Sequence, residues 1–103
     1  MSPSIFLNYI TFNFFPAPKG YEIFKEDSKK TCRRKKGNLI ITRPLFTFKS
    51  CVEICDKNKK CDFFFWSKML HTQGLCMTFK DCKKKKLETI KGLLRKGTTY
   101  QKE

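Results

Sequence analysis

A small disulfide-bonded α+β domain is the fold class that this sequence predicts, and three observations support it. The chain has 103 residues, too few to be comfortably stable on apolar packing alone, yet it carries six cysteines. An amphipathic helical pattern follows Thr47, and two of the cysteines fall on its apolar stripe. The aromatic run at 63–66 is typical of a strand that is covered on both faces. The length fits one domain.

The six cysteines favour a disulfide framework in an oxidising compartment. Each bridge of such a framework stabilises a small domain by about 2–4 kcal/mol. Two alternatives stay open, namely six reduced thiols in a cytosolic protein and a zinc site. The spacings C-x3-C, C-x5-C and C-x14-C lack the paired C-x2-C of most tetrahedral zinc sites, and His71 is the single nitrogen ligand in the sequence. We therefore expect neither a metal nor another cofactor.

The charge of the chain is strongly basic, with 23 Lys and Arg against 9 Asp and Glu and a net charge of +14. Such a field favours polyanionic partners, which include sulfated glycans, nucleic acids and anionic membrane surfaces. The alternative is that the lysines only keep a small domain in solution, because lysine is abundant throughout the chain.

The first 18 residues carry no charged side chain, and residues 5–15 are apolar but too short to span a bilayer. We interpret residues 1–19 as an apolar leader, a degraded signal peptide, followed by a linker. An extra strand, or a piece of a longer chain, is the alternative interpretation. Pro16, Pro18 and Gly20 break any regular element. The folded domain is therefore expected at 20–103.

One helix is expected to begin after Thr47 and to end near Lys57, because threonine is a good N-cap residue. The β-carbons of Cys51 and Cys55 should lie about 5–6 Å apart on this helix, whereas a disulfide needs about 3.8 Å. We therefore expect these two cysteines to bond to different partners and to attach the helix at two points. The apolar stripe of the helix consists of Phe48, Cys51, Val52 and Cys55.

Several stretches have the composition of strands. Residues 21–24, 39–42 and 97–100 are short strand patterns, the second of them stopped by Pro44. Residues 87–94 have a loosely helical spacing of apolar side chains, which Gly92 weakens.

The aromatic strand begins at Cys61 and should be the central strand, because both of its faces are aromatic. Core packing is the expected role of its rings, with Trp66 the member expected to be exposed if any of them stacks on a ligand. Residues 75–79 follow as its hairpin partner, in which Cys76 faces opposite to Leu75 and Met77.

The order of these elements resembles the PAN/apple domain family. The resemblance is carried by residues 50–68 (SCVEICDKNKKCDFFFWSK), by residues 74–79 (GLCMTF) and by the closing G-x-x-Y at 97–100. It covers residues 20–103. It implies a small disulfide-stapled antiparallel sheet crossed by one α-helix, with a hairpin on the other face. It also implies a module that binds proteins or carbohydrates without catalysis.

The resemblance implies a disulfide pairing as well. The pairs usual in that family would be Cys51–Cys76 and Cys55–Cys61, which leaves Cys32 and Cys82 for each other. This third pair departs from the family, in which an extra bridge often ties the two ends of the domain together. Six cysteines permit 15 pairings.

Two basic clusters are the candidate ligand-binding residues. A Cys32–Cys82 bridge would bring them together into one patch, for which the expected ligand is a sulfated or otherwise acidic glycan such as heparin. The alternative for each cluster is a solvated loop. The first cluster is Lys29, Lys30, Arg33, Arg34, Lys35 and Lys36, and the second is Lys80, Lys83, Lys84, Lys85 and Lys86.

The leading hypothesis is a secreted, extracellular recognition module, and no enzyme, because no catalytic set can be placed together from the sequence. A second hypothesis is a protein–protein adhesion module that contacts a cell-surface protein through loops such as 69–74, with incidental lysines. A third is an intracellular protein that binds nucleic acid through phosphate contacts and base stacking. Six cysteines in a disulfide-like pattern argue against the third hypothesis.

Overall fold

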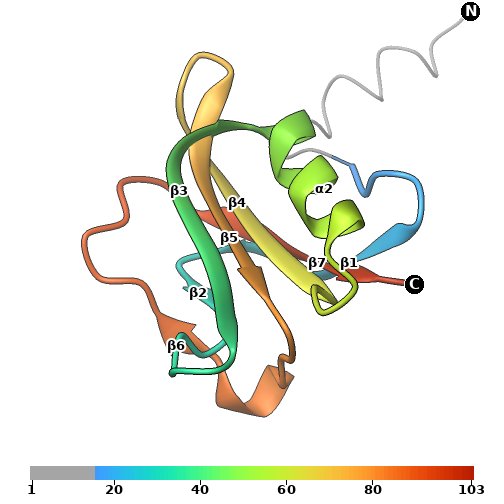
Figure 1. The fold of residues 1–103 in the computed structure, drawn as a ribbon. Helices are drawn as coiled ribbons and strands as arrows, with labels where there is room; N and C mark the ends of the chain where they lie inside the picture. The colour runs from blue at the N-terminus through green and yellow to red at the C-terminus, as the bar shows by residue number, and fades with distance from the viewer. Residues whose placement is uncertain (1–15) are drawn as a thin grey trace, which may run out of the picture.

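Strand β4 (Phe63–Leu70) lies at the centre of a five-stranded antiparallel sheet in the structure, a computed structural model that describes residues 16–103. The strand order is β1-β7-β4-β5-β3 (Figure 1). This order confirms that the aromatic strand is central. Most of the predicted leader, residues 1–15, lies outside the described residues. The other strands of the sheet are β1 (Tyr21–Ser28), β3 (Leu39–Thr47), β5 (Gln73–Phe79) and β7 (Gly97–Lys102).

One face of the sheet is covered by α2 (Phe48–Lys57), the α-helix of the described part of the chain (Figure 1). The helix begins where the sequence predicts, because the Thr47 hydroxyl accepts a hydrogen bond from the Ser50 backbone N–H at 3.1 Å. Cys51 and Cys55 of this helix are fully buried. Their stripe is therefore the face that packs on the sheet.

Two disulfides attach this helix to the sheet. Cys51 bonds to Cys76 of β5, and Cys55 bonds to Cys61, which lies just before β4. The expectation of two separate partners is confirmed. Both bridges belong to an aromatic core that includes Phe64 of β4, stacked on Tyr100 of β7 with ring centroids 4.8 Å apart.

The opposite face of the sheet is covered by two loops, 29–38 and 80–96. They pair through a short ladder between β2 (Lys30–Thr31) and β6 (Glu88–Thr89), and the second loop contains a 3-10 turn, η1 (Lys84–Lys86). Since β2 and β6 are far apart in sequence, this cover is not a hairpin. The apolar cluster beneath it consists of Cys32, Phe63, Phe65, Met77, Phe79, Ile90 and Leu93.

Two predicted features of the backbone differ in the structure. Pro44 does not stop the strand at 39–42, because β3 is an edge strand and its register with β5 shifts between Arg43 and Phe46. A proline N–H is not missed at an edge or a bulge. Residues 87–94 form no helix, because Gly92 adopts a positive φ of 78° and Ile90 and Leu93 are buried against the sheet instead.

Trp66 is buried rather than exposed, with 4% of its surface accessible. Its indole Nε1–H donates to the Phe46 carbonyl at 3.0 Å, so the ring bridges β4 and β3 beneath α2. It offers no stacking surface to a ligand. Within residues 16–103, none of the helices has the length and apolar character needed to cross a bilayer.

Candidate anion-binding site

The loops 29–38 and 80–96 carry the two basic clusters, and we call them the basic loops. They meet at the Cys32–Cys82 disulfide. The two residues are 50 positions apart in sequence, and their α-carbons lie 4.9 Å apart. The cysteines are thus joined in the three pairs that the family resemblance implies, and no cysteine of the described residues is free. Residues 33–36 and 83–86 are unbroken runs of basic residues. Because the first run follows Cys32 and the second follows Cys82, the bridge brings the starts of the two runs side by side.

Asn38 holds the same two loops together by hydrogen bonds. Its side-chain Nδ2 donates to the Arg33 carbonyl at 2.7 Å and to the Asp81 carbonyl at 3.0 Å. Its Oδ1 accepts from the Asp81 backbone N–H at 2.9 Å. The residue is buried, with 7% of its surface exposed. All three bonds cross to neighbouring backbone, so Asn38 fixes the shape of both loops.

A tight turn delivers Asn38 to this position. The Asn38 backbone N–H donates to the Lys35 carbonyl at 3.0 Å, and Gly37 between them has a φ of +89°. Glycine adopts this left-handed conformation without steric cost. The turn ends the basic run and starts β3 at the next residue, Leu39.

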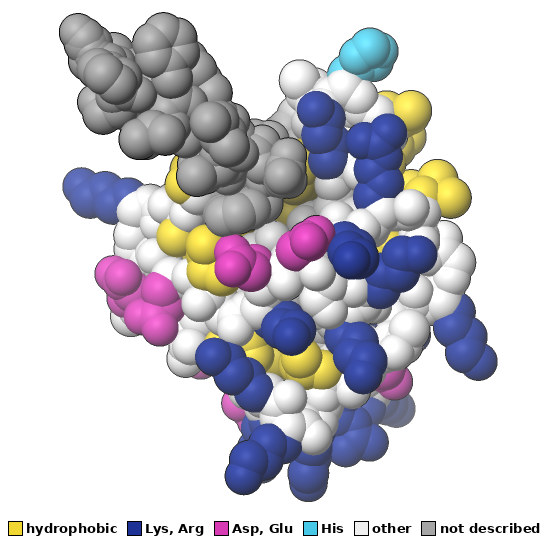
Figure 2. Space-filling model, turned by 180° about the vertical axis from the view of Figure 1, so that it is seen from behind, with side chains coloured by type: hydrophobic (Ala, Val, Ile, Leu, Met, Phe, Trp, Pro, Cys, Tyr) yellow, Lys and Arg dark blue, Asp and Glu magenta, His cyan; other side chains and the backbone are white. Residues whose placement is uncertain are grey.

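A hollow of about 100 Å³ lies between the loops. Four of the residues that line it are basic, two from each loop, and one is acidic. Figure 2 shows Lys and Arg side chains spread over one face of the molecule, several of them at the end where η1 and β6 lie in Figure 1. The residues that line the hollow are Arg33, Lys35, Asn38, Asp81, Cys82, Lys83 and Lys86.

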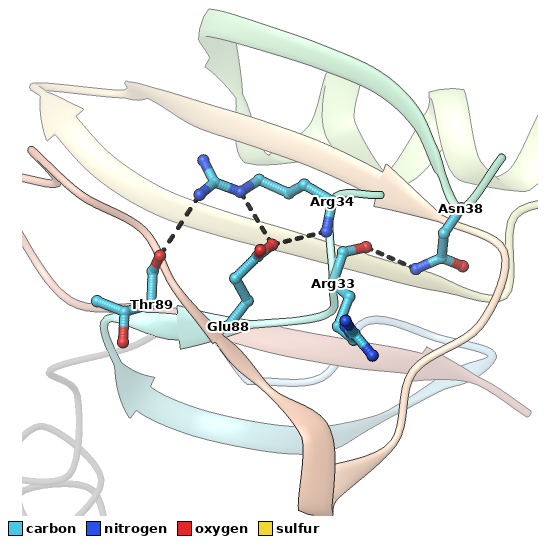
Figure 3. A network of polar contacts seen from close by, with 5 residues as sticks. All are labelled: Arg33, Arg34, Asn38, Glu88 and Thr89. Carbon is cyan, nitrogen blue, oxygen red and sulfur yellow. Dashed lines mark hydrogen bonds and ion pairs between the residues drawn. The ribbon is translucent and has the colours of Figure 1, made fainter. Parts of the chain in front are cut away.

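Arg34 is used for structure rather than for the hollow. Its backbone N–H donates to Glu88 Oε1 at 2.7 Å, and its Nε forms an ion pair with the same oxygen at 3.3 Å. Its Nη2 donates to the Thr89 carbonyl at 3.4 Å. Figure 3 shows the side chains of Arg33 and Arg34 pointing in different directions from adjacent residues. The backbone hydrogen bond from Arg34 is the main cause that lowers the pKa of Glu88 below its ordinary value.

Lys84 is also held by the fold. Its Nζ lies 5.1 Å from the centroid of the Phe24 ring, a cation–π geometry. Phe24 in turn packs edge-on against Phe63, with ring centroids 5.0 Å apart. The contact therefore ties η1 to β1 and β4.

The remaining candidate residues are exposed but do not line the hollow. The structure thus places four of the candidates at the hollow, directs Arg34 and Lys84 to internal contacts and leaves the others exposed elsewhere on the two loops. These others are Lys29, Lys30, Lys36, Lys80 and Lys85.

Sequence reasoning missed Asn38 and Asp81. The sequence holds one indication of the role of Asn38. It is an uncharged amide that stands between a basic run ending in a glycine and the first residue of a predicted strand. Asp81 is the one acid among the residues that line the hollow. Of the nine acids of the chain, only Asp81 and Glu88 belong to the two loops. The surrounding charge is therefore dominated by lysine and arginine.

The arrangement is suited to binding an anion. Basic residues from two chain segments line one open hollow, and the segments are fixed by a disulfide and by the buried amide of Asn38. Within residues 16–103, no three His, Cys, Asp or Glu side chains gather as a metal site would require.

Comparisons with protein-family models, with curated proteins and with solved structures found no match to this chain.

Proposed function

We propose that residues 20–103 form a PAN/apple-like recognition module, without catalytic activity, that binds sulfated or otherwise acidic glycan through its two basic loops. The observation that carries the proposal is the hollow between the loops, because both loops contribute cations to it. Arg33 and Lys35 come from one loop, and Lys83 and Lys86 from the other.

The architecture supports the family part of the proposal. An antiparallel sheet is crossed by one helix in the described part of the chain, and two disulfides attach that helix. Three disulfides in a domain of this size also fit an oxidising compartment, which supports a secreted protein.

The burial of the aromatic strand supports glycan over nucleic acid. Single-stranded nucleic acids are commonly bound by stacking their bases on exposed aromatic rings. The four aromatic residues of β4 are instead core residues, each with at most 5% of its surface exposed. Charge is therefore the main means of recognition at this surface, and a sulfated glycan presents charge without needing a stacking platform.

Chromatography on immobilised heparin tests the proposal. The variant neutralises three lysines of the second loop, Lys83→Gln, Lys85→Gln and Lys86→Gln, and keeps Lys84 because it packs on Phe24. The matched control removes the same charge from exposed lysines on and just after α2, Lys49→Gln, Lys59→Gln and Lys60→Gln. We expect the loop variant to elute at clearly lower salt than the control. Equal elution of the two variants would mean that net charge alone retains the protein.

One observation favours the second candidate, a protein–protein adhesion module. Leu70 is 58% exposed at the end of β4, beside the turn at His71, and Leu94 is 74% exposed. An apolar contact there would depend little on ionic strength, whereas binding through several lysines weakens steeply as salt rises. The salt dependence of binding to a candidate partner separates the two functions.

A further inference from the structure

The hollow between the basic loops has a geometry that selects the shape of an anion as well as its charge. We propose that it takes one tetrahedral oxyanion, the O-sulfate ester of a sugar, and that it discriminates against a carboxylate of equal charge. This inference rests on the proposed glycan-binding function and narrows it to a chemical group.

The size of the hollow fits a single charged group. Pockets for drug-sized ligands have volumes of about 300–1,000 Å³, whereas this hollow has about 100 Å³. A whole oligosaccharide would therefore lie across the surface, and one substituent of one ring would enter the hollow.

The placement of the cations favours a tetrahedral group. Arg33 and Lys35 belong to one chain segment, and Lys83 and Lys86 to another. A sulfate ester has three terminal oxygens that point in different directions, so it can accept hydrogen bonds from both segments at once. A carboxylate has two coplanar oxygens, which match one guanidinium fork well but do not reach two separate groups of donors equally.

The scaffold fixes the backbone that carries these cations before any ligand binds. The Cys32–Cys82 bridge and the hydrogen bonds of Asn38 to Arg33 and Asp81 fix the backbone on both sides of the hollow. Binding a group to a preformed site avoids the entropy loss of ordering two loops.

The neighbouring acids leave the hollow positively charged. Glu88 is engaged by the backbone and the side chain of Arg34, outside the residues that line the hollow. Asp81 is the one acid of the lining. A carboxylate accepts hydrogen bonds from sugar hydroxyls, so its presence suits an anion carried on a sugar ring.

The test is a titration followed by amide chemical shifts in ¹⁵N-labelled protein. The probes are methyl glucoside 6-sulfate, methyl glucuronide and methyl glucoside 6-phosphate, at pH 5, where a phosphate monoester carries about one charge. We expect the sulfate to bind at least threefold more tightly than the carboxylate, with shifts centred on the residues that line the hollow. Equal affinities of sulfate and carboxylate would overturn the inference, and so would binding of the phosphate alone.

Variants locate the effect. Arg33→Gln and Lys86→Gln should each weaken sulfate binding by about threefold to tenfold, the range for the loss of one hydrogen bond of ordinary net strength, and Lys86→Arg should restore most of it. Lys49→Gln, with the same charge change on α2, should leave the affinity unchanged. If Lys49→Gln weakens binding as much as Lys86→Gln, the hollow is not the site.

The outcome is separable from that of the proposed function. Heparin retention that depends on the loop lysines, together with equal binding of sulfate and carboxylate, would keep the glycan module and reject the selective hollow. Loss of both effects would reject the proposed function itself.

Discussion

The side-chain amide of Asn38 pairs with the backbone of Asp81 as a neighbouring strand would. Nδ2 donates to the Asp81 carbonyl at 3.0 Å, and Oδ1 accepts from the Asp81 N–H at 2.9 Å. A buried side chain thus replaces a segment of sheet and holds the second basic loop against the first. The consequences of this pairing can be measured.

The substitution Asn38→Ala should lower the free energy of unfolding by about 1–3 kcal/mol. The Asp81 N–H and the carbonyls of Arg33 and Asp81 would lose their buried hydrogen-bond partner. Urea denaturation of the variant and the wild type measures the difference. Asn58→Ala is the control, since Asn58 Oδ1 only accepts a local, exposed hydrogen bond from the Lys60 N–H. A loss no larger than that of the control would show that the pairing does not stabilise the loops.

Removing the Cys32–Cys82 bridge should lower the free energy of unfolding more than removing the Cys55–Cys61 bridge, because it closes a longer loop of chain. The Cys32–Cys82 pair has a sequence separation of 50 and the Cys55–Cys61 pair one of 6. The loop-entropy relation gives a loss of about 4 kcal/mol for the first bridge and about 2 kcal/mol for the second. Unfolding curves of the paired Cys→Ala variants test this order. The reverse order would mean that the loops are already restrained in the unfolded chain.

Glu88 should make stability depend on pH. Its pKa is lowered in the folded state by hydrogen bonds from Arg34, so its contribution is fully present above the ordinary glutamate pKa, about 4.3. The contribution is lost as the pH falls through the lowered pKa. The wild type should therefore be more stable than Glu88→Gln at pH 7, by a modest amount because the pair is partly exposed. A difference that persists unchanged at pH 3 would exclude the charge as its cause.

The order of disulfide reduction should follow the exposure of the cysteine residues. Cys82 is partly exposed, whereas the other five cysteines are 0% exposed. Thiol–disulfide exchange requires access to a sulfur atom. Brief treatment of the native protein with a dithiol, followed by alkylation and peptide mass spectrometry, should label Cys32 and Cys82 first. Early labelling of Cys51 or Cys55 would contradict the burial of the helix bridges.

The parts of the fold that could be predicted from the sequence depend on local signals. Thr47 has the chemistry of an N-cap, and the spacing of Cys51 and Cys55 on one helical stripe excludes a bond between them; the structure confirms both. The two apolar faces of the aromatic strand predict its central position, and the strand order confirms it.

The features that could not be predicted depend on tertiary contacts. An edge strand that accommodates Pro44 looks no different in sequence from a strand that ends there. Trp66 is buried because Phe46 of another strand supplies an acceptor for its N–H. Ile90 and Leu93 have helical spacing, but they pack on the sheet from an irregular loop.

The candidate site was predicted in part for the same reason. Runs of lysine and arginine are visible in the sequence, but which of them converge depends on contacts between distant segments. The side chain of Arg34 donates to Glu88, which is 54 positions away in sequence, and the Lys84 ammonium packs over the Phe24 ring. Asn38, which shapes the hollow, carries no charge and so does not stand out in the sequence.

The most direct measurement is the affinity for a heparin octasaccharide of folded protein with and without the Cys32–Cys82 bridge. The Cys32→Ala, Cys82→Ala variant keeps every charged residue, and the Cys55→Ala, Cys61→Ala variant loses a bridge on the opposite face of the sheet. If the bridge forms one anion-binding surface from two loops, the first variant should bind several-fold more weakly and the second should match the wild type. Equal affinity of all three proteins would contradict a joined surface.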